Sequence, residues 1–170
     1  MSAESRGEDP FLTGRMTASF VKGCQHHPAS ATQLLTTAML KDFAVYNLES
    51  SQPVGGSDWQ LRDKYNAVVS HADLRQSFLP AFVAGVSAGV RSMMTSYHAL
   101  NGIPATAHPL IQSELRHRLG WEGMMMSDGG AVGFMLNFKY LNLSLTDNIT
   151  AAAAAALNSG VDINSGGFMQ

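Results

Sequence analysis

The segment that indicates the fold most clearly is residues 123–130, which read Gly-Met-Met-Met-Ser-Asp-Gly-Gly. Three consecutive methionines between a glycine and the polar pair Ser127-Asp128 are typical of a short strand that is buried on both faces. Asp128 then stands at the carboxyl end of that strand, directly before a glycine turn. In a parallel sheet, the carboxyl ends of the strands are where chemically active side chains gather.

Three other short apolar runs have the same character as the methionine strand. They cover residues 37–43, 90–97 and 160–164, and each ends in polar or glycine residues. From Met94 onward, successive strands lie about 32 to 36 residues apart, close to the roughly 31 residues per unit of an eight-stranded (β/α)8 barrel. Because four strands cannot close such a barrel, the pattern predicts a partial TIM barrel of about its last four to five units.

Two helical patterns lie between these strands. Residues 70–89 begin with a capping box at Ser70 and carry an apolar face, while Pro80 inside them predicts a kink or an early end. Residues 109–120 begin at a proline, repeat leucine and isoleucine at helical spacing, and stop at a glycine. Each of the two segments is therefore expected to form a helix that covers the sheet.

Two more helices complete the predicted order. An alanine-rich stretch has Thr146 as its expected cap and Gly160 as its end, and a further helix is expected over residues 12–23. Strands that alternate with helices are typical of right-handed crossovers and a parallel sheet. The sequence therefore predicts an α/β fold, parallel strands with flanking helices, as a single partial barrel domain over residues 1–170.

Composition and charge exclude several classes of protein. The 11 Lys and Arg residues are balanced by 13 Asp and Glu residues, which argues against a nucleic-acid surface and a polybasic membrane patch. The longest run of small apolar residues, 151–157, is far shorter than the ~20 residues of a membrane span, and the polar start has no signal-peptide pattern. Scattered histidines, one cysteine and the lack of a glycine-rich nucleotide loop predict no metal and no cofactor.

The carboxyl ends of the predicted strands supply the candidate site residues, and each has two open interpretations. Asp128 is either a helix N-cap or a catalytic carboxylate. Lys41 and Asp42 form a local ion pair, or the lysine reaches a ligand while the aspartate points elsewhere. Tyr97 and His98 either contribute to a site or simply open a turn.

An ordered set of short motifs runs through practically the whole chain. Residues 7–16 read Gly-Glu-Asp-Pro-Phe-Leu-Thr-Gly-Arg-Met and match a GEDPxLxGRM pattern. The motifs that follow in order are Lys41-Asp-Phe43, Asn66-Ala-Val-Val-Ser70, Asp73-Leu-Arg75, Met94-Thr-Ser-Tyr97, Asn101-Gly-Ile-Pro104, Trp121-Glu-Gly123, Ser127-Asp-Gly-Gly-Ala131 and residues 156–162. Together they resemble the amino-terminal domain of glycoside hydrolase family 3, in its β-xylosidase and β-glucosidase branch.

The resemblance implies a retaining exo-β-glycosidase that hydrolyses a β-linked oligosaccharide or glycoside. The family's nucleophile falls on Asp128, which would form a covalent glycosyl-enzyme. Its sugar-contacting lysine, methionine and tyrosine fall on Lys41, Met94 and Tyr97. Asp42 stands where the family has a histidine that contacts the sugar, so it is the remaining expected substrate contact.

Departures from the family pattern keep a second hypothesis open, a catalytically inactive fragment with a carbohydrate-binding or structural role. The Lys-His pair of the family is Lys41-Asp42 here, and His98 stands where an asparagine is usual. The resemblance also implies that the first barrel strands and the second domain, which usually carries the acid/base glutamate, are absent from this chain. The family is often secreted, but the chain shows no signal peptide, so its compartment is left open.

Overall fold

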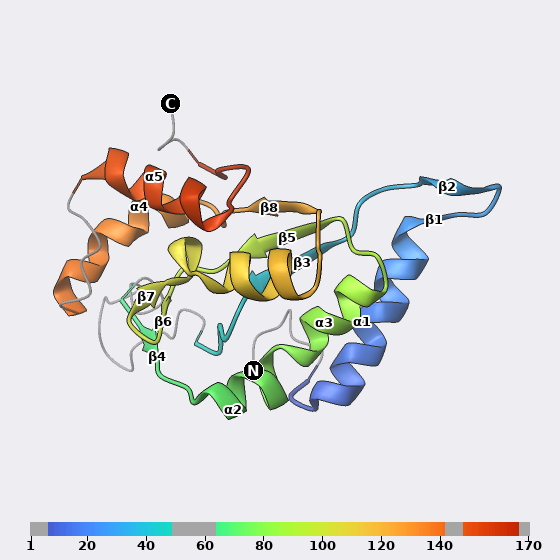
Figure 1. Ribbon diagram of the computed structural model, residues 1–170, viewed down its shortest axis with the longest axis horizontal. Helices are drawn as coiled ribbons and strands as arrows, with labels where there is room; N and C mark the ends of the chain where they lie inside the picture. The colour runs from blue at the N-terminus through green and yellow to red at the C-terminus, as the bar shows by residue number, and fades with distance from the viewer. Residues whose placement is uncertain (1–6, 49–63, 142–147, 167–170) are drawn as a thin grey trace, which may run out of the picture.

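A parallel sheet forms the centre of the computed structural model, which describes residues 7–48, 64–141 and 148–166. Its strands are β3 (Met39–Phe43), β5 (Ser92–Thr95) and β8 (Met124–Met126), paired in the order β3-β5-β8 (Figure 1). A parallel bridge between Met126 and Ile163 extends the same order by one segment. Three of the four predicted strands are confirmed and lie side by side in chain order, whereas the fourth segment, residues 160–164, forms only this single bridge.

The register of the sheet follows from its buried methionines. Leu40 lies opposite Met93, and Met93 lies opposite Met125. Met93 and Met125 are completely buried, as a strand covered on both faces requires. The sheet therefore presents its three carboxyl ends along one edge.

Helices cover the sheet, and Figure 1 shows them on both of its sides. They are α1 (Pro10–Gln25), α2 (His71–Asp73), η1 (Leu74–Phe78), α3 (Pro80–Ser87), η3 (Ile111–Arg118), α4 (Ala131–Phe134), η4 (Met135–Leu141) and α5 (Ile149–Ser159). The side chain of Gln25 joins the end of α1 to the amino edge of the sheet, because its carbonyl oxygen accepts from the backbone N–H groups of Ala38 and Arg91. A buried amide that is satisfied in this way holds helix and strands in one arrangement.

The predicted capping box and the predicted kink are both present. The hydroxyl of Ser70 accepts from the backbone N–H of Asp73 at 3.0 Å and donates to its carboxylate at 2.7 Å. The helix that follows is interrupted by a π turn, in which the N–H of Leu79 bonds to the carbonyl of Leu74, and it restarts at Pro80 as α3. Proline supplies no N–H, so it suits the first turn of the new helix.

The alanine-rich helix is confirmed, but its cap lies two residues later than expected. The side chain of Asn148 accepts from the N–H of Thr150 at 2.8 Å, and α5 begins at Ile149. The predicted cap, Thr146, lies outside the described residues. Gly160 ends the helix at a positive φ of 104°, where a residue with a Cβ atom would be strained.

Several small elements were not predicted from the sequence. They are the hairpin β1 (His26–His27) and β2 (Ser30–Leu34), the small sheet of β4 (Asn66–Ala67), β6 (Ala99–Leu100) and β7 (Ile103–Pro104), and the 3-10 turn η2 (Ala105–Ala107). Their strands are too short to show a period-two pattern, and tertiary contacts decide them. The small sheet holds the segment that follows β5 beside residues 64–67.

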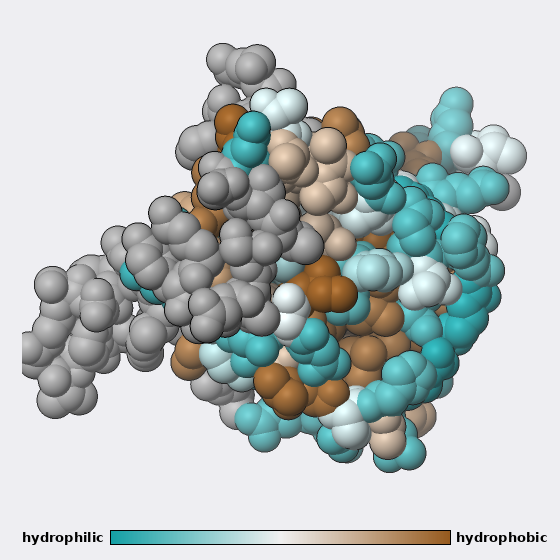
Figure 2. All heavy atoms as spheres, turned by 60° about the vertical axis from the view of Figure 1, so that its left-hand side comes forward, coloured by the Kyte–Doolittle hydropathy of each residue, from teal (hydrophilic) through white to brown (hydrophobic). Residues whose placement is uncertain are grey.

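The outer face of α1 is apolar as well as its inner face. Gly14, Thr17 and Val21 are buried, whereas Leu12 and Phe20 on the other side are 53% and 42% exposed. On the face shown in Figure 2, hydrophobic side chains likewise reach the surface in separate patches among hydrophilic ones. None of the described helices is both long and apolar enough to cross a membrane.

Candidate active site

The carboxyl edge of the sheet brings the predicted site residues onto one rim. Lys41 and Asp42 lie in β3, Met94 lies in β5 opposite Met126 of β8, and Tyr97 and Asp128 each follow the end of their strand by two residues. Since β5 pairs with both β3 and β8, its end lies between the other two. The parallel register therefore places Tyr97 between the segments that carry Lys41 and Asp128.

A network of backbone and hydroxyl groups holds the segment that carries Asp128. The buried hydroxyl of Ser127 donates to the side-chain oxygen of Asn164 at 3.1 Å and accepts from the N–H of Ser165 at 2.9 Å. The N–H of Gly130 donates to the carbonyl of Ser165 at 2.6 Å. The chain at residues 163–166 thus clamps the turn on both sides of Asp128, whose carboxylate is left half-buried at the rim.

The helix-cap interpretation of Asp128 is wrong. The N-cap of α4 is Gly130, at a φ of 76° and without any side-chain cap. The carboxylate of Asp128 accepts instead from the N–H of Gly129 at 2.6 Å. The left-handed backbone at Gly130 directs the helix away, because only glycine adopts that conformation at no steric cost.

Tyr97 leans toward the turn that carries Asp128. A Cβ atom at Gly129 would lie 3.7 Å from the hydroxyl oxygen of Tyr97. The Tyr97 ring lies 5.4 Å from that of Phe134, in α4, and 6.2 Å from that of Tyr46, which follows β3 (distances between ring centroids). Tyr97 therefore bridges the ends of β3 and β8, and its half-buried ring lies beside the candidate nucleophile's turn.

Lys41 and Asp42 form the local ion pair that was one of the two interpretations. The ammonium nitrogen of Lys41 lies 3.8 Å from a carboxylate oxygen of Asp42, and their side chains are 41% and 18% exposed. Asp42 has a φ of 64°, in the left-handed region that Asp, Asn and His enter more readily than other side chains. A charge of each sign is thus present at the end of β3.

His98, for which the sequence left open a role in a site or in a turn, is fully buried. Burial, followed by repulsion from His108, lowers the pKa of His98 to about 4, while the Ala44 carbonyl opposes the change. Burial also lowers the pKa of His108 to about 4. Both imidazoles are therefore neutral at pH 7. The His98 ring packs beside those of Tyr46 and Tyr65, which lie far from it in the sequence, so no local sequence pattern indicated its burial.

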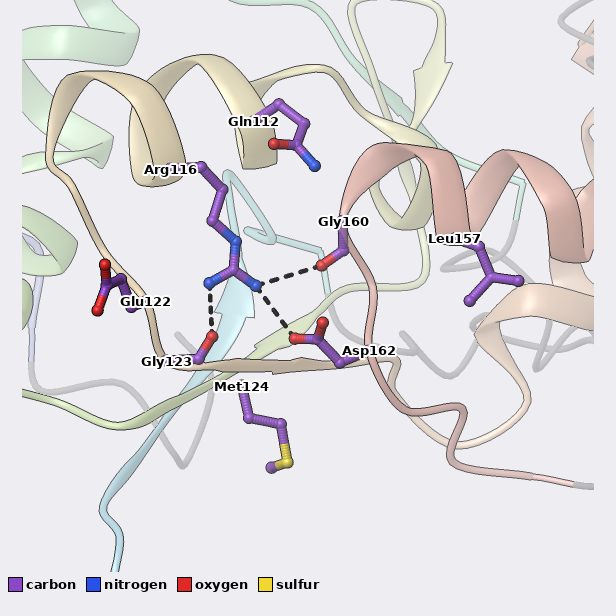
Figure 3. Close-up of a pocket in the computed structure, with 8 residues that line it drawn as sticks. All are labelled: Gln112, Arg116, Glu122, Gly123, Met124, Leu157, Gly160 and Asp162. Carbon is purple, nitrogen blue, oxygen red and sulfur yellow. Dashed lines mark hydrogen bonds and ion pairs between the residues drawn. The ribbon is translucent and has the colours of Figure 1, made fainter.

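A cavity of about 650 Å³ lies at the opposite end of the strands. Its residues include Arg116, Glu122, Gly123, Met124 and Asp162, and Figure 3 shows the Arg116 side chain pointing to the start of β8. The guanidinium donates to the carbonyls of Trp121 and Gly123 and to the Asp162 carboxylate. Residues at the amino ends of strands usually serve stability rather than chemistry, and this arginine has its donors committed to the protein.

Glu114 and Glu122 lie away from the candidate rim. Glu114 forms ion pairs with Arg75 and Arg118 on the helices, and Glu122 precedes β8 at the cavity of Figure 3. Glu8 precedes α1. Within the described ranges, no three His, Cys, Asp or Glu side chains gather as a metal site would need.

Comparison with known proteins gives the family. The model of the glycosyl hydrolase family 3 N-terminal domain matches residues 1–165. The chain is 36% identical over 171 residues to the exo-1,4-beta-xylosidase bxlB of Emericella nidulans, and the match covers 98% of this chain and 21% of that protein. It is 32% identical to the beta-xylosidase/alpha-L-arabinofuranosidase 2 of Medicago sativa subsp. varia, with 98% of this chain and 20% of that protein covered.

Solved structures agree with these relatives. The exo-beta-xylosidase XlnD, in complex with a xylobiose aziridine activity-based probe, superposes with a TM-score of 0.80 at 28% identity, over 96% of this chain and 20% of that one. The beta-glucosidase of Listeria innocua, in complex with isofagomine, gives 0.72 at 30% identity, over 95% and 21%. The chain thus spans about one fifth of the proteins that it matches. It belongs to glycosyl hydrolase family 3, and residues 1–165 match the N-terminal domain of that family.

Proposed function

We propose that this chain carries the nucleophile half of a retaining exo-β-glycosidase of the β-xylosidase or β-glucosidase type. The observation that carries the proposal is the rim itself: Asp128 stands at the end of β8, in a turn clamped by Asn164 and Ser165, with the Tyr97 hydroxyl beside it. A carboxylate that is held rigidly and left accessible is what nucleophilic attack on a sugar requires. The homologous xylosidases and glucosidases support glycosides as the substrate class.

The reaction follows from two carboxyl groups on opposite sides of the scissile bond. A carboxylate oxygen of Asp128 attacks the anomeric carbon, the bond from that carbon to the leaving oxygen breaks, and a second carboxylic acid donates its proton to that oxygen. The same second group, now a carboxylate, then takes a proton from water, which attacks the anomeric carbon and releases Asp128. Glu114 and Glu122 lie away from the rim, so in this proposal the acid/base belongs to the second domain of a family 3 enzyme, as the family resemblance implies.

The other rim residues are assigned to sugar binding. Lys41 and Tyr97 supply an ammonium donor and a phenol, both suited to sugar hydroxyls. Met94 offers a flexible apolar contact from β5. Asp42 completes the set as an acceptor at the end of β3. Groups that fix the ring in this way lower the barrier by orienting the anomeric carbon toward the nucleophile.

Covalent trapping tests the role of Asp128. The protein is incubated with 2,4-dinitrophenyl 2-deoxy-2-fluoro-β-xyloside, whose acidic leaving group departs without a proton donor, and intact mass reports the adduct. We expect one adduct on the unaltered chain, mapped to Asp128 by peptide digestion, and none on Asp128→Asn, because an amide is not a nucleophile. The control Glu122→Gln, exposed at the opposite end of β8, keeps the adduct. An adduct that survives in Asp128→Asn contradicts the assignment.

A second candidate function is carbohydrate binding without catalysis, and the Lys41–Asp42 ion pair favours it. At 3.8 Å, Asp42 competes with a sugar for the Lys41 ammonium. Asp42→His restores the residue implied by the family resemblance, at a backbone conformation that histidine tolerates. We expect the variant to bind isofagomine more tightly by calorimetry, whereas Lys41→Met abolishes binding. Unchanged or weaker binding in Asp42→His shows that the ion pair does not impair the sugar site.

Turnover tests whether the isolated chain contains a complete catalytic site. Without the acid/base group, leaving-group protonation is lost, which removes roughly 10²–10⁴-fold in rate. We expect residues 1–170 to hydrolyse aryl β-xylosides and β-glucosides no faster than their Asp128→Ala variant does. Turnover well above that control, from a monodisperse monomer, shows that the chain itself contains a complete site.

A further inference from the structure

One fully buried imidazole lies directly behind the rim. The side chain of His98 has no exposed surface, and its ring lies 5.4 Å from the Tyr46 ring and 6.0 Å from the Tyr65 ring, with which it is stacked. These two tyrosines belong to the segment after β3 and the segment before β4. His98 itself follows β5. A single side chain thus joins three separate segments of the chain.

A hydrogen bond fixes the orientation of this ring. Nδ1 of His98 lies 3.0 Å from the hydroxyl oxygen of Ser96, which in turn donates to the carbonyl of Phe43 at 3.5 Å. Because the hydroxyl has only one proton, Nδ1–H is the donor to Ser96 in this arrangement. The carbonyl of His98 also accepts from the N–H of Ala105 at 2.9 Å. The residues on both sides of Tyr97 are therefore anchored in the core.

The contacts of His98 extend to Tyr97 through a row of rings. Tyr46 contacts the His98 ring on one side and the Tyr97 ring on the other, and Tyr97 continues the row to Phe134 in α4. Packed rings are not continuously deformable, so a displacement of one ring moves its neighbours. The position of the Tyr97 hydroxyl beside Gly129 thus depends on the ring that follows it in the sequence.

We propose that His98 is a positioning residue for Tyr97: its neutral ring, bonded to Ser96 and held between Tyr46 and Tyr65, keeps the Tyr97 hydroxyl at the rim, and protonation of the ring releases it. The consequence for sugar binding rests on the proposed function. The role of His98 in positioning Tyr97 does not rest on the proposed function, because it concerns the rim of the protein without sugar.

The surroundings of His98 oppose a positive charge. The titratable groups that face it are the phenols of Tyr46 and Tyr65 and the imidazole of His108, which repels a second charge. The ring is completely buried, and Nε2, the atom that would take the proton, makes no hydrogen bond to the described residues. The Ala44 carbonyl, in contrast, favours the charged form of the His98 imidazole. A charge that arises here is relieved when the ring moves toward water.

Nuclear magnetic resonance of the chain labelled in its histidine and tyrosine rings tests this inference between pH 7 and pH 3.5. We expect the Tyr97 ring signals, assigned with Tyr97→Phe, to change with the midpoint of the His98 imidazole. The indole N–H of Trp121 bonds to the Val90 carbonyl at the amino edge of the sheet, and its signal stays unchanged through that midpoint. A Trp121 signal that changes together with Tyr97 means global unfolding and overturns the inference.

The variant His98→Asn supplies the decisive comparison. An amide bonds to Ser96 and does not titrate, so the Tyr97 signals become independent of pH until the protein unfolds. A Tyr97 transition that persists in this variant belongs to His108 and overturns the proposal. The exposed His117→Asn serves as the matched control and behaves like the unaltered chain.

Saturation transfer to D-xylose adds the functional readout. We expect it to fall with the same midpoint in the unaltered chain and to persist in His98→Asn. Transfer that is independent of pH in the unaltered chain, while the Tyr97 signals change, contradicts the link between ring position and binding. A chain that binds no xylose at any pH counts against the proposed function, and the tyrosine signals still decide the role of His98.

Discussion

Arg116 is the side chain whose loss should most weaken the fold away from the candidate site. Its guanidinium donates to the carbonyls of Trp121 and Gly123 at 3.0 and 2.5 Å and to the Asp162 carboxylate at 3.0 Å, and it lies 4.7 Å from the Trp121 ring centroid. These contacts join η3 to the start of β8 and to the segment after α5. Only 20% of the side chain is exposed, so water replaces few of its bonds.

The expected cost of Arg116→Met follows from those contacts. Bonds from a charged donor to buried carbonyls contribute about 1.5–3 kcal/mol each, and stacking on the indole contributes about 1 kcal/mol. The ion pair adds little, because the Asp162 side chain is 49% exposed. Since some water enters the site, we expect the free energy of unfolding to fall by about 3–5 kcal/mol. That is a large fraction of the ~5–15 kcal/mol of a typical domain.

Urea unfolding followed by far-ultraviolet circular dichroism measures this loss. Tryptophan fluorescence is avoided because the substitution lies beside Trp121 itself. The control is Arg91→Met, at an exposed arginine, which should change the free energy by less than about 0.5 kcal/mol. Arg116→Lys should fall between the two, because a lysine keeps the charge but not the planar fork. A loss below about 1 kcal/mol in Arg116→Met, or one equal to that of the control, refutes the reasoning.

The remaining predictions also concern stability and use the same urea assay. Gly123→Ala should lower the free energy of unfolding by about 2 kcal/mol or more, because the new Cβ atom would lie 2.6 Å from a backbone carbonyl oxygen. The control Gly23→Ala, at a position with open space around it, should leave that free energy unchanged or raise it. Ser70→Ala should cost about 1 kcal/mol, and a smaller loss than in Ser77→Ala, an exposed serine of η1, would contradict the cap. With unfolded pKa values near 6.5 and folded values of about 4, His98 and His108 bind protons more weakly in the folded state. Stability should therefore fall by about 2 kcal/mol per histidine from pH 8 to pH 5, and a flat profile would contradict their burial.

The candidate rim has a different physical basis from the Arg116 cavity. At the amino edge, the Arg116 guanidinium donates hydrogen bonds to backbone carbonyls, and these bonds stabilise the sheet. At the carboxyl edge, the Asp128 carboxylate accepts from the N–H of the neighbouring Gly129, while hydroxyl and amide groups around it hold its backbone. A rigid backbone with an accessible side chain is suited to chemistry, whereas a saturated side chain is suited to structure. The cavity of about 650 Å³ lies at the end of the strands opposite the candidate rim.

The sequence by itself determined the strands and the chemistry that they carry. Continuous apolar runs around Met93 and Met125 identify strands covered on both faces, because burial leaves no alternation to solvent. Local bonding rules also sufficed for the capping box at Ser70 and for the break at Pro80. Asp128, Lys41 and Tyr97 were found as candidates because they end such strands and because the ordered motifs resemble family 3; their roles are still predictions.

Only the tertiary structure decided which partners those residues meet. The capping role of Asp128 failed because Gly130 takes a left-handed backbone that depends on the clamp from Ser165, which lies 38 residues after Ser127 in the chain. The burial of His98 depends on Tyr46 and Tyr65, which no local pattern connects to it. Short-range forces set the strands and caps, and they leave a signal at fixed spacing. Contacts between segments far apart in the chain set pKa values, ring positions and cavities, and such contacts leave no pattern at fixed spacing in the sequence.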